Sequence, residues 1–186
     1  MPLRQKGLYI MEKKLYPLGV RRDGSYYTRV LWSDTTEKDP LLWVANLIDD
    51  DLDRNGGTWG ANTTTTANAV LDFFGETLPV KQISIFRNVG ITISVHGELA
   101  KYINIYVNNT NEPRKLRSFE DKVDDVEWKQ IAHFDVIMNE GWQSIVLDEP
   151  VDAKFIRVEL KDNFCNGEIP WDETNELKLF PEVTTL

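Results

Sequence analysis

Residues 46–60, NLIDDDLDRNGGTWG, concentrate side chains that could bind a cation. Four aspartates fall within five positions, and an Asn-Gly-Gly turn follows them. Calcium takes about six to eight hard oxygen ligands, and glycines supply turns that direct carbonyls inward. Blocks of like charge are also common in solvated loops that bind nothing. The stretch predicts either a cation site or an acidic surface loop, and the apolar entry Leu47-Ile48 and the indole of Trp59 favour an ordered loop.

The charge of the whole chain narrows the classes of partner. The 186 residues carry a net charge of −9, with a sequence pI near 4.8. Nucleic acid and anionic membrane surfaces need basic patches, so we expect neither as a partner. No apolar run approaches the roughly 18 residues of a membrane span, so we expect no membrane insertion. A single cysteine, Cys165, excludes an internal disulfide.

The elements that position these residues are predicted to be strands. Short alternating runs rich in β-branched and aromatic residues recur between turn clusters, which is typical of an antiparallel sandwich or barrel. Helical turns are expected only at Leu41–Asp50 and Phe119–Val126. The predicted strands are Leu8–Tyr16, Tyr26–Trp32, Ala69–Phe74, Val80–Arg87, Tyr102–Asn108, Trp128–Phe134, Gln143–Leu147, Ala153–Leu160 and Glu176–Phe180.

The sequence offers little material for catalysis. It has no nucleophile-elbow, phosphate-loop, dinucleotide or zinc-protease motif, and only two histidines accompany the single cysteine. A pair of carboxylates, as glycosidases use, stays open in so acidic a chain. We therefore expect a binding domain and not an enzyme.

Six short motifs occur in order along the chain. They are Ala45 to Asp49, Thr58-Trp59, Ala69 to Phe73, Pro79 to Ile85, Ala153 to Val158 and Asn175 to Phe180. In this order the chain resembles a discoidin domain, also called a coagulation factor 5/8 type C domain, over roughly residues 30–183. The resemblance implies an all-β, antiparallel β-sandwich of the galactose-binding-like jelly-roll type, which many family 32 carbohydrate-binding modules share. Residues 1–29 would then be an N-terminal extension or extra edge strands, and residues 30–186 the sandwich.

The chain departs from the family pattern in two places. Asp50 stands where the family has a glycine, and the loop from there to Thr58 is longer than usual. A charged insertion, Asn108 to Asp125, replaces the usual short turn after the middle strand.

The resemblance also implies a structural calcium ion. In the family the ion lies in the loop after the first motif, and a glutamate of the last strand completes its ligands. Carried over, the predicted ligands are Asn46 and Thr58 through nearby carbonyls, and the side chains of Asp49, Asp51, Asp53 and Glu176. Whether Asp49 or Asp53 leads the coordination stays open, and so does a loop without metal.

Sugar binding in the resembled family occurs on loops at one end of the sandwich. An aromatic ring covers the apolar face of a pyranose, while Arg, Asn, His and carboxylates bond its hydroxyls. The residues that fit are Arg87, Asn88, His96, Glu98, Phe164 and Trp171. Arg87 can instead be a salt-bridged strand end, and Phe164 or Trp171 can simply pack the sandwich end. Arg157 is expected to form an ion pair within the scaffold.

These observations predict a non-catalytic carbohydrate-binding module with a structural calcium ion. Its expected partner is a glycan of galactose or N-acetyl-hexosamine type. The expected location is the cell surface or outside the cell, with the module either alone or part of a larger protein. The alternative is a discoidin-like adhesion domain that binds protein and has no sugar specificity.

Overall fold

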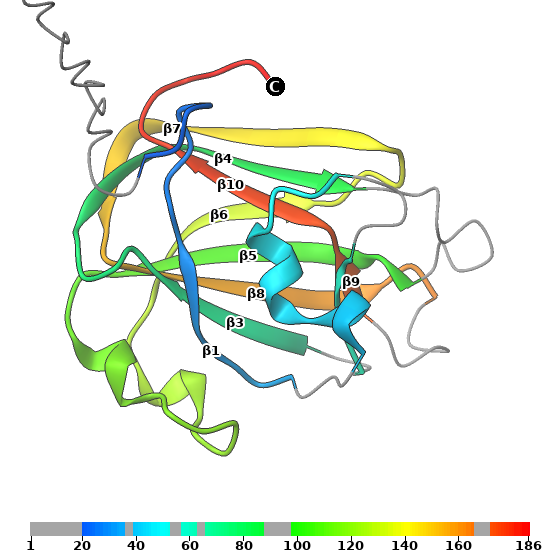
Figure 1. The fold of residues 1–186 in the computed structure, drawn as a ribbon, viewed down its shortest axis with the longest axis horizontal. Helices are drawn as coiled ribbons and strands as arrows, with labels where there is room; N and C mark the ends of the chain where they lie inside the picture. Colours follow the sequence, from blue (N-terminus) through cyan, green and yellow to red (C-terminus); the bar gives the residue numbers. More distant parts are fainter. Residues whose placement is uncertain (1–19, 36–38, 53–56, 63–65, 88–97, 166–171) are drawn as a thin grey trace, which may run out of the picture.

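The strands form two facing antiparallel sheets and a third, two-stranded sheet (Figure 1). The computed structural model describes residues 20–35, 39–52, 57–62, 66–87, 98–165 and 172–186. In order, the five-stranded sheet contains β1 (Arg29–Ser33), β3 (Thr66–Asp72), β8 (Phe155–Asn163), β5 (Ala100–Asn108) and β6 (Lys129–Asp135). The three-stranded sheet contains β10 (Glu176–Phe180), β4 (Leu78–Arg87) and β7 (Gly141–Ala153), and β2 (Trp59–Ala61) pairs with β9 (Asp172–Thr174). The predicted all-β antiparallel sandwich is confirmed.

Alternation along the strands builds the core between the sheets. Successive side chains of a strand point to opposite faces, so every second residue faces the core. Ile83 and Ile85 of β4 and Ile156 and Val158 of β8 all belong to one buried cluster. Each such side chain contributes about 1.5–3 kcal/mol by leaving water. Trp59 of β2 is fully buried in the same cluster, so the short third sheet closes the core at one end.

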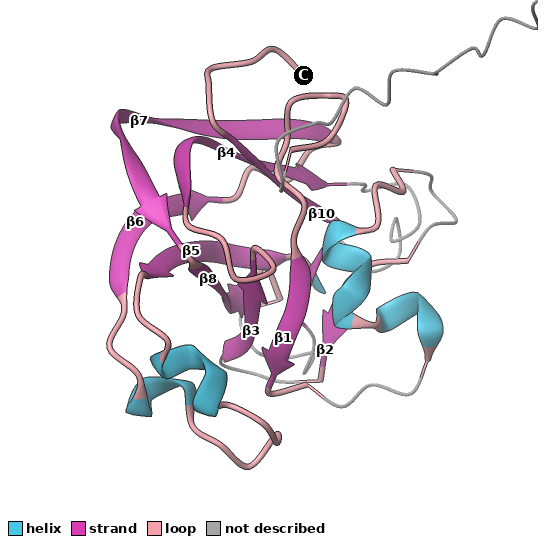
Figure 2. Ribbon diagram, turned by 60° about the vertical axis from the view of Figure 1, so that its left-hand side comes forward, coloured by secondary structure: helices cyan, strands magenta, loops and turns pink. Residues whose placement is uncertain are grey.

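Short 3₁₀ helices are the helical turns of the described chain (Figure 2). Two of them, η1 (Pro40–Leu42) and η2 (Val44–Ile48), confirm the turn predicted over Leu41–Asp50. The turn predicted over Phe119–Val126 is confirmed by η5 (Val123–Asp125). A further turn, η4 (Glu112–Lys115), was not predicted. No helix among the described residues is long and apolar enough to cross a membrane.

The charged insertion after β5 covers a second, smaller core. Leu116, Val123 and Val126 of the insertion pack with Val70 of β3 and Phe155 of β8, and Trp32 joins the same cluster. These strand residues point away from the main core, on the outer face of the five-stranded sheet. Because its apolar residues are widely spaced among charges, the insertion gives no periodic signal of this packing.

The boundary regions differ from the sequence expectations in detail. The predicted strand Leu8–Tyr16 lies outside the described residues. Residues 20–28 contact the sandwich: the Tyr26 amide donates to the Leu179 carbonyl at 2.7 Å, its hydroxyl donates to the Pro79 carbonyl, and its ring is buried in the main core. The strands β2 and β9 were not predicted, because three residues are too few to show alternation.

Candidate functional site

The described candidate residues meet at one end of the sandwich, on the right of Figure 1. Arg87 ends β4, Glu98 precedes β5, Phe164 follows β8 and Glu176 begins β10. The pairings of Ala100 with Asn163 and of Glu176 with Phe86 place these strand ends side by side. We call this the β9 end, because β9 lies there. Four other predicted residues lie outside the described chain: Asp53, Asn88, His96 and Trp171.

Arg87 is buried and holds the connection between β6 and β7, which belong to different sheets. Its Nη1 donates to Gln143 Oε1 at 2.7 Å, and its Nη2 donates to the Gly141 carbonyl at 3.0 Å. Gln143 in turn donates from Nε2 to the Asp135 carbonyl at 2.8 Å. Burial lowers the pKa of the guanidinium, and its Nε–H has no hydrogen-bond partner. Among the described residues, no carboxylate pairs with Arg87.

Glu98 and Phe164 are both partly withdrawn from solvent. Glu98 is 9% exposed, and burial raises the pKa of its carboxyl. Leu99 forms a bridge with Glu173 of β9, and the charge of Glu98 adds to the burial that raises the pKa of Glu173 to about 7. Phe164 packs its half-buried ring against the main core. The β9 end therefore combines a cation, carboxylates and an aromatic ring in a partly desolvated setting.

Hydrogen bonds from Asn46 fix the start of the acidic loop that follows η2. Its Nδ2 donates to the carbonyls of Pro40 at 2.9 Å and Thr58 at 3.0 Å. The Thr58 amide donates to the Leu41 carbonyl at 2.7 Å, which joins the two ends of the loop. Asn46 thus acts on the loop through its side-chain amide.

The side chain of Asn46 leaves no room for a side chain at Gly57. A Cβ there would lie 2.0 Å from Asn46 Nδ2 and 2.5 Å from Cγ. We expect Gly57→Ala to cost about 2 kcal/mol or more of unfolding free energy, measured by urea denaturation. In the double variant Gly57→Ala, Asn46→Ala the clash is gone, so its cost should fall below the sum of the two single costs. Additive costs would contradict this packing.

Glu176 is the most deeply buried of the predicted metal ligands. It has no exposed surface, and its Oε1 has no hydrogen-bond partner. Its Oε2 accepts from the Asp50 amide at 3.1 Å. Burial, with the nearby charge of Asp49, raises the pKa of Glu176 to about 8. Burial also raises the pKa of Asp49, and the charges of Asp51 and Asp50 add to this.

The carboxylates of Asp49 and Glu176 repel each other, and together they suit a divalent cation. Their repulsion and the unpartnered oxygen of Glu176 would both be relieved by a positive charge between them. Asp50 is otherwise engaged, with its carboxylate 2.5 Å from Lys178 Nζ. Within the described ranges, no group of three or more His, Cys, Asp or Glu residues could hold a metal ion. The remaining ligands of such an ion would have to be carbonyls, hydroxyls or water.

Sequence reasoning missed the polar residues of β9. Asp172, Glu173 and Thr174 are all buried, although the sequence Asp-Glu-Thr is typical of an exposed turn. Their burial follows from the pairing of β9 with β2, and these two strands are more than 100 residues apart in the sequence. Only the closeness of these acids to Glu176 in the sequence could have suggested a role.

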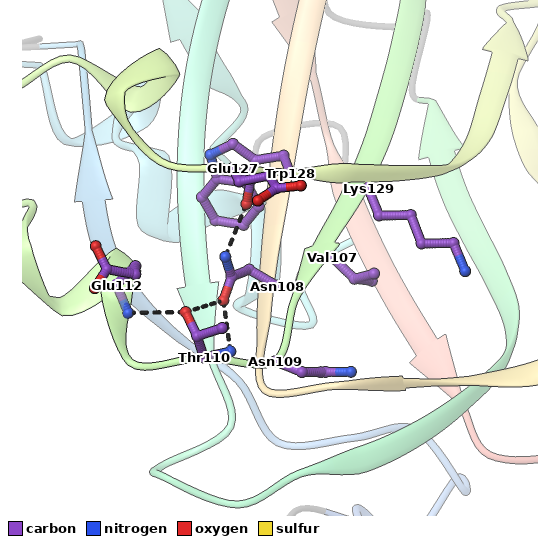
Figure 3. Close-up of a pocket in the computed structure, with 8 residues that line it drawn as sticks. All are labelled: Val107, Asn108, Asn109, Thr110, Glu112, Glu127, Trp128 and Lys129. Atoms are coloured by element: carbon purple, nitrogen blue, oxygen red, sulfur yellow. Dashed lines mark hydrogen bonds between the residues drawn. The ribbon is translucent and has the colours of Figure 1, made fainter.

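A rival site is a pocket at the opposite end of the sandwich (Figure 3). It has a volume of about 240 Å³ and includes the half-buried indole of Trp128. Its amides are already engaged: Asn108 Nδ2 donates to the Glu127 carbonyl at 2.8 Å, while its Oδ1 accepts from the Thr110 amide and hydroxyl. Asn109 Oδ1 accepts from the Lys154 amide. The side-chain amide of Asn108 and the Oδ1 of Asn109 are therefore committed to hydrogen bonds within the protein.

Comparisons with known proteins find relatives by structure and not by sequence. No family model matches the chain, and no curated protein matches its sequence significantly. The family 32 carbohydrate-binding module of Streptococcus pneumoniae EndoD superimposes with a TM-score of 0.60 at 12% identity, covering 83% of this chain and 96% of that module.

Two modules from Clostridium perfringens are similar as well. The family 32 module of NanJ, solved in complex with galactose, gives a TM-score of 0.56 at 14% identity over 82% of this chain and 92% of its own. A further family 32 module, in complex with GalNAc-β-1,3-galactose, gives 0.57 at 11% identity over 82% of this chain and 94% of its own. The predicted resemblance is thus confirmed at the level of the fold: this chain has the discoidin-like, galactose-binding-like β-sandwich of family 32 carbohydrate-binding modules.

Proposed function

We propose that this chain is a non-catalytic carbohydrate-binding module that holds a glycan at the β9 end. The observation that carries the proposal is the match to family 32 modules along nearly their whole length, two of them solved with galactose-containing sugars. The proposed ligand class is a neutral galactose- or N-acetyl-hexosamine-type glycan, and the proposed location is the cell surface or outside the cell.

The chemistry of the β9 end supports this placement. Arg87 carries an N–H without a partner, and the carboxylate of Glu98 lies near the start of β5. Arg87 would position the connection between β6 and β7 beside the sugar through its bonds to Gln143 and Gly141. The carboxylate of Glu98 would accept from sugar hydroxyls, and Phe164 supplies an aromatic ring. A shallow site with few contacts predicts weak affinity.

A structural calcium ion is part of the proposal. Asp49 and Glu176 would hold it, and it would join the loop after η2 to the start of β10. The ion supplies positive charge and fixes loop ends, and it takes no part in any reaction. Asn46 and Thr58 shape the loop through the hydrogen bond between them.

A glycan array with the calcium-loaded protein tests the ligand class. We expect signals on glycans that end in galactose or N-acetyl-hexosamine. No signal above background would favour the adhesion alternative, a discoidin-like domain without sugar specificity.

The placement of the site is tested by Arg87→Lys against a glycan found on the array. Lysine keeps the charge but loses the planar fork, so we expect affinity to fall about tenfold or more by calorimetry. Arg114→Lys, at an exposed position near the rival pocket, is the matched control and should bind like the wild type. Equal affinity in the two variants, with unchanged melting temperatures, would show that the site is misplaced.

A further inference from the structure

One face of β9 carries two buried polar side chains toward the core. Side chains two apart on a strand share a face, so Asp172 and Thr174 point the same way. They pair across the ladder with Ala61 and Trp59 of β2, both of which belong to the main apolar cluster. Asp172 has no exposed surface, and Thr174 is 1% exposed.

Three oxygens on this face have no hydrogen-bond partner. They are Asp172 Oδ1, Asp172 Oδ2 and Thr174 Oγ1. A buried polar group without a partner costs about 1–3 kcal/mol, and a buried unpaired charge costs more. Such a set of orphaned oxygens is unusual in a folded protein and calls for a missing partner.

A second acid lies close to this face. Asp162 is near the end of β8, which packs against β9, and its backbone adopts a φ of 52°. Burial, with the charge of Asp162, raises the pKa of Asp172 to about 7. No lysine or arginine of the described chain pairs with Asp172, so the described residues do not balance the negative charge of the two acids.

We propose that Asp172, Thr174 and Asp162 form a second calcium site, separate from the Asp49–Glu176 site. Two carboxylates and a hydroxyl are hard oxygen ligands, and their charge balances that of a divalent cation. Calcium accepts irregular geometry and completes its shell with carbonyls or water, whereas magnesium demands a near-ideal octahedron. The ion would fix β8 to β9 and so hold the loop ends on which the candidate glycan residues stand. The proposal does not rest on glycan binding.

Counting calcium ions tests it. After chelation, the protein is dialysed against calcium, and the bound metal is measured by atomic emission for the wild type, Asp172→Asn, Glu176→Gln and the double variant. We expect two ions, one, one and none. If calcium binds at the Asp172 site but not at the Asp49–Glu176 site, the wild type holds one ion and Asp172→Asn holds none. If Asp172→Asn binds as many ions as the wild type, the proposal is overturned, and the oxygens of Asp172 are satisfied by a proton.

Two further readouts keep the result interpretable. Asp172→Asn is isosteric and removes an unbalanced charge, so in chelator it should melt at or above the temperature of the wild type. Terbium binds calcium sites and luminesces when a nearby tryptophan is excited, and Trp59 lies directly across the ladder from Thr174. Terbium luminescence should persist in Glu176→Gln and be lost in the double variant. Luminescence that survives Asp172→Asn in that background would also overturn the proposal.

Discussion

Chelation should lower the melting temperature of this protein by about 10 °C relative to the same protein in millimolar calcium. The reason is mass action: a ligand that binds only the folded state at about 1,000 times its dissociation constant stabilises it by about 4 kcal/mol. In a chain of this length, each kcal/mol shifts the melting temperature by about 2–4 °C. Without the ion, the buried carboxyl of Glu176 keeps one unpartnered oxygen and is repelled by the nearby charge of Asp49, which is exposed.

The variant Glu176→Gln assigns the effect to its site. It removes one carboxylate of the proposed pair, so its calcium-induced shift should be clearly smaller than that of the wild type, measured by differential scanning fluorimetry. In chelator the variant should be at least as stable as the wild type, because a buried unpaired acid has become a neutral amide. Glu149→Gln changes an exposed glutamate of β7 in the same way and should respond to calcium fully. An unchanged melt of the wild type in excess chelator would contradict both calcium sites.

Arg157→Ala should destabilise the protein by about 3 kcal/mol in urea denaturation. The side chain of Arg157 is 7% exposed, and its guanidinium donates to Asn68 Oδ1, Asp124 Oδ1 and Glu159 Oε1 at 2.9, 2.8 and 3.1 Å. It also lies 5.0 Å from the ring centre of Tyr106. Removing one partner of a buried ion pair costs about 3–5 kcal/mol, since the other charge stays buried. Asn104 and Tyr106 still donate hydrogen bonds to Glu159 in the variant, so we expect a cost at the lower end of this range.

Replacing Arg157 should also weaken the attachment of the charged insertion to the sheet. Asp124 belongs to η5, so Arg157 ties the charged insertion to the outer face of the five-stranded sheet. Arg157→Lys keeps the charge but cannot make all three bonds, and we expect an intermediate cost. Lys115→Ala removes an exposed pair with Glu112 and should cost less than about 0.5 kcal/mol. If Arg157→Ala is no more harmful than Lys115→Ala, the network does not anchor the insertion.

The fold was largely predictable because its long strands alternate cleanly. In β8, Ile156, Val158 and Leu160 point into the core while Arg157 and Glu159 point out, and the sequence shows that period directly. The prediction that Arg157 forms a scaffold ion pair is confirmed for the same reason. The strand β9 could not be predicted, since its three polar residues are buried only through pairing with β2.

The places of the described candidate residues along the strands could be predicted, but their environment could not. The position of Arg87 at a strand exit follows from the β4 pattern, whereas its contact with Gln143 depends on the register of β7 against β4. The role of Glu176 came from the family resemblance, and its burial depends on the approach of the acidic loop from the far end of the chain. Asp172 gave no signal beyond its closeness to Glu176 in the sequence, because a short polar run of this kind is ordinarily solvated.

The most direct test of the glycan-binding proposal is a nuclear magnetic resonance titration of the calcium-loaded protein with galactose and N-acetylgalactosamine. The account predicts concentration-dependent shifts of backbone amides at the β9 end, including Arg87, Glu98 and Phe164. The amides that line the rival pocket, from Asn108 to Thr110 and from Glu127 to Lys129, should stay unchanged. Shifts confined to that pocket, or no shifts with any glycan that the array identifies, would contradict it.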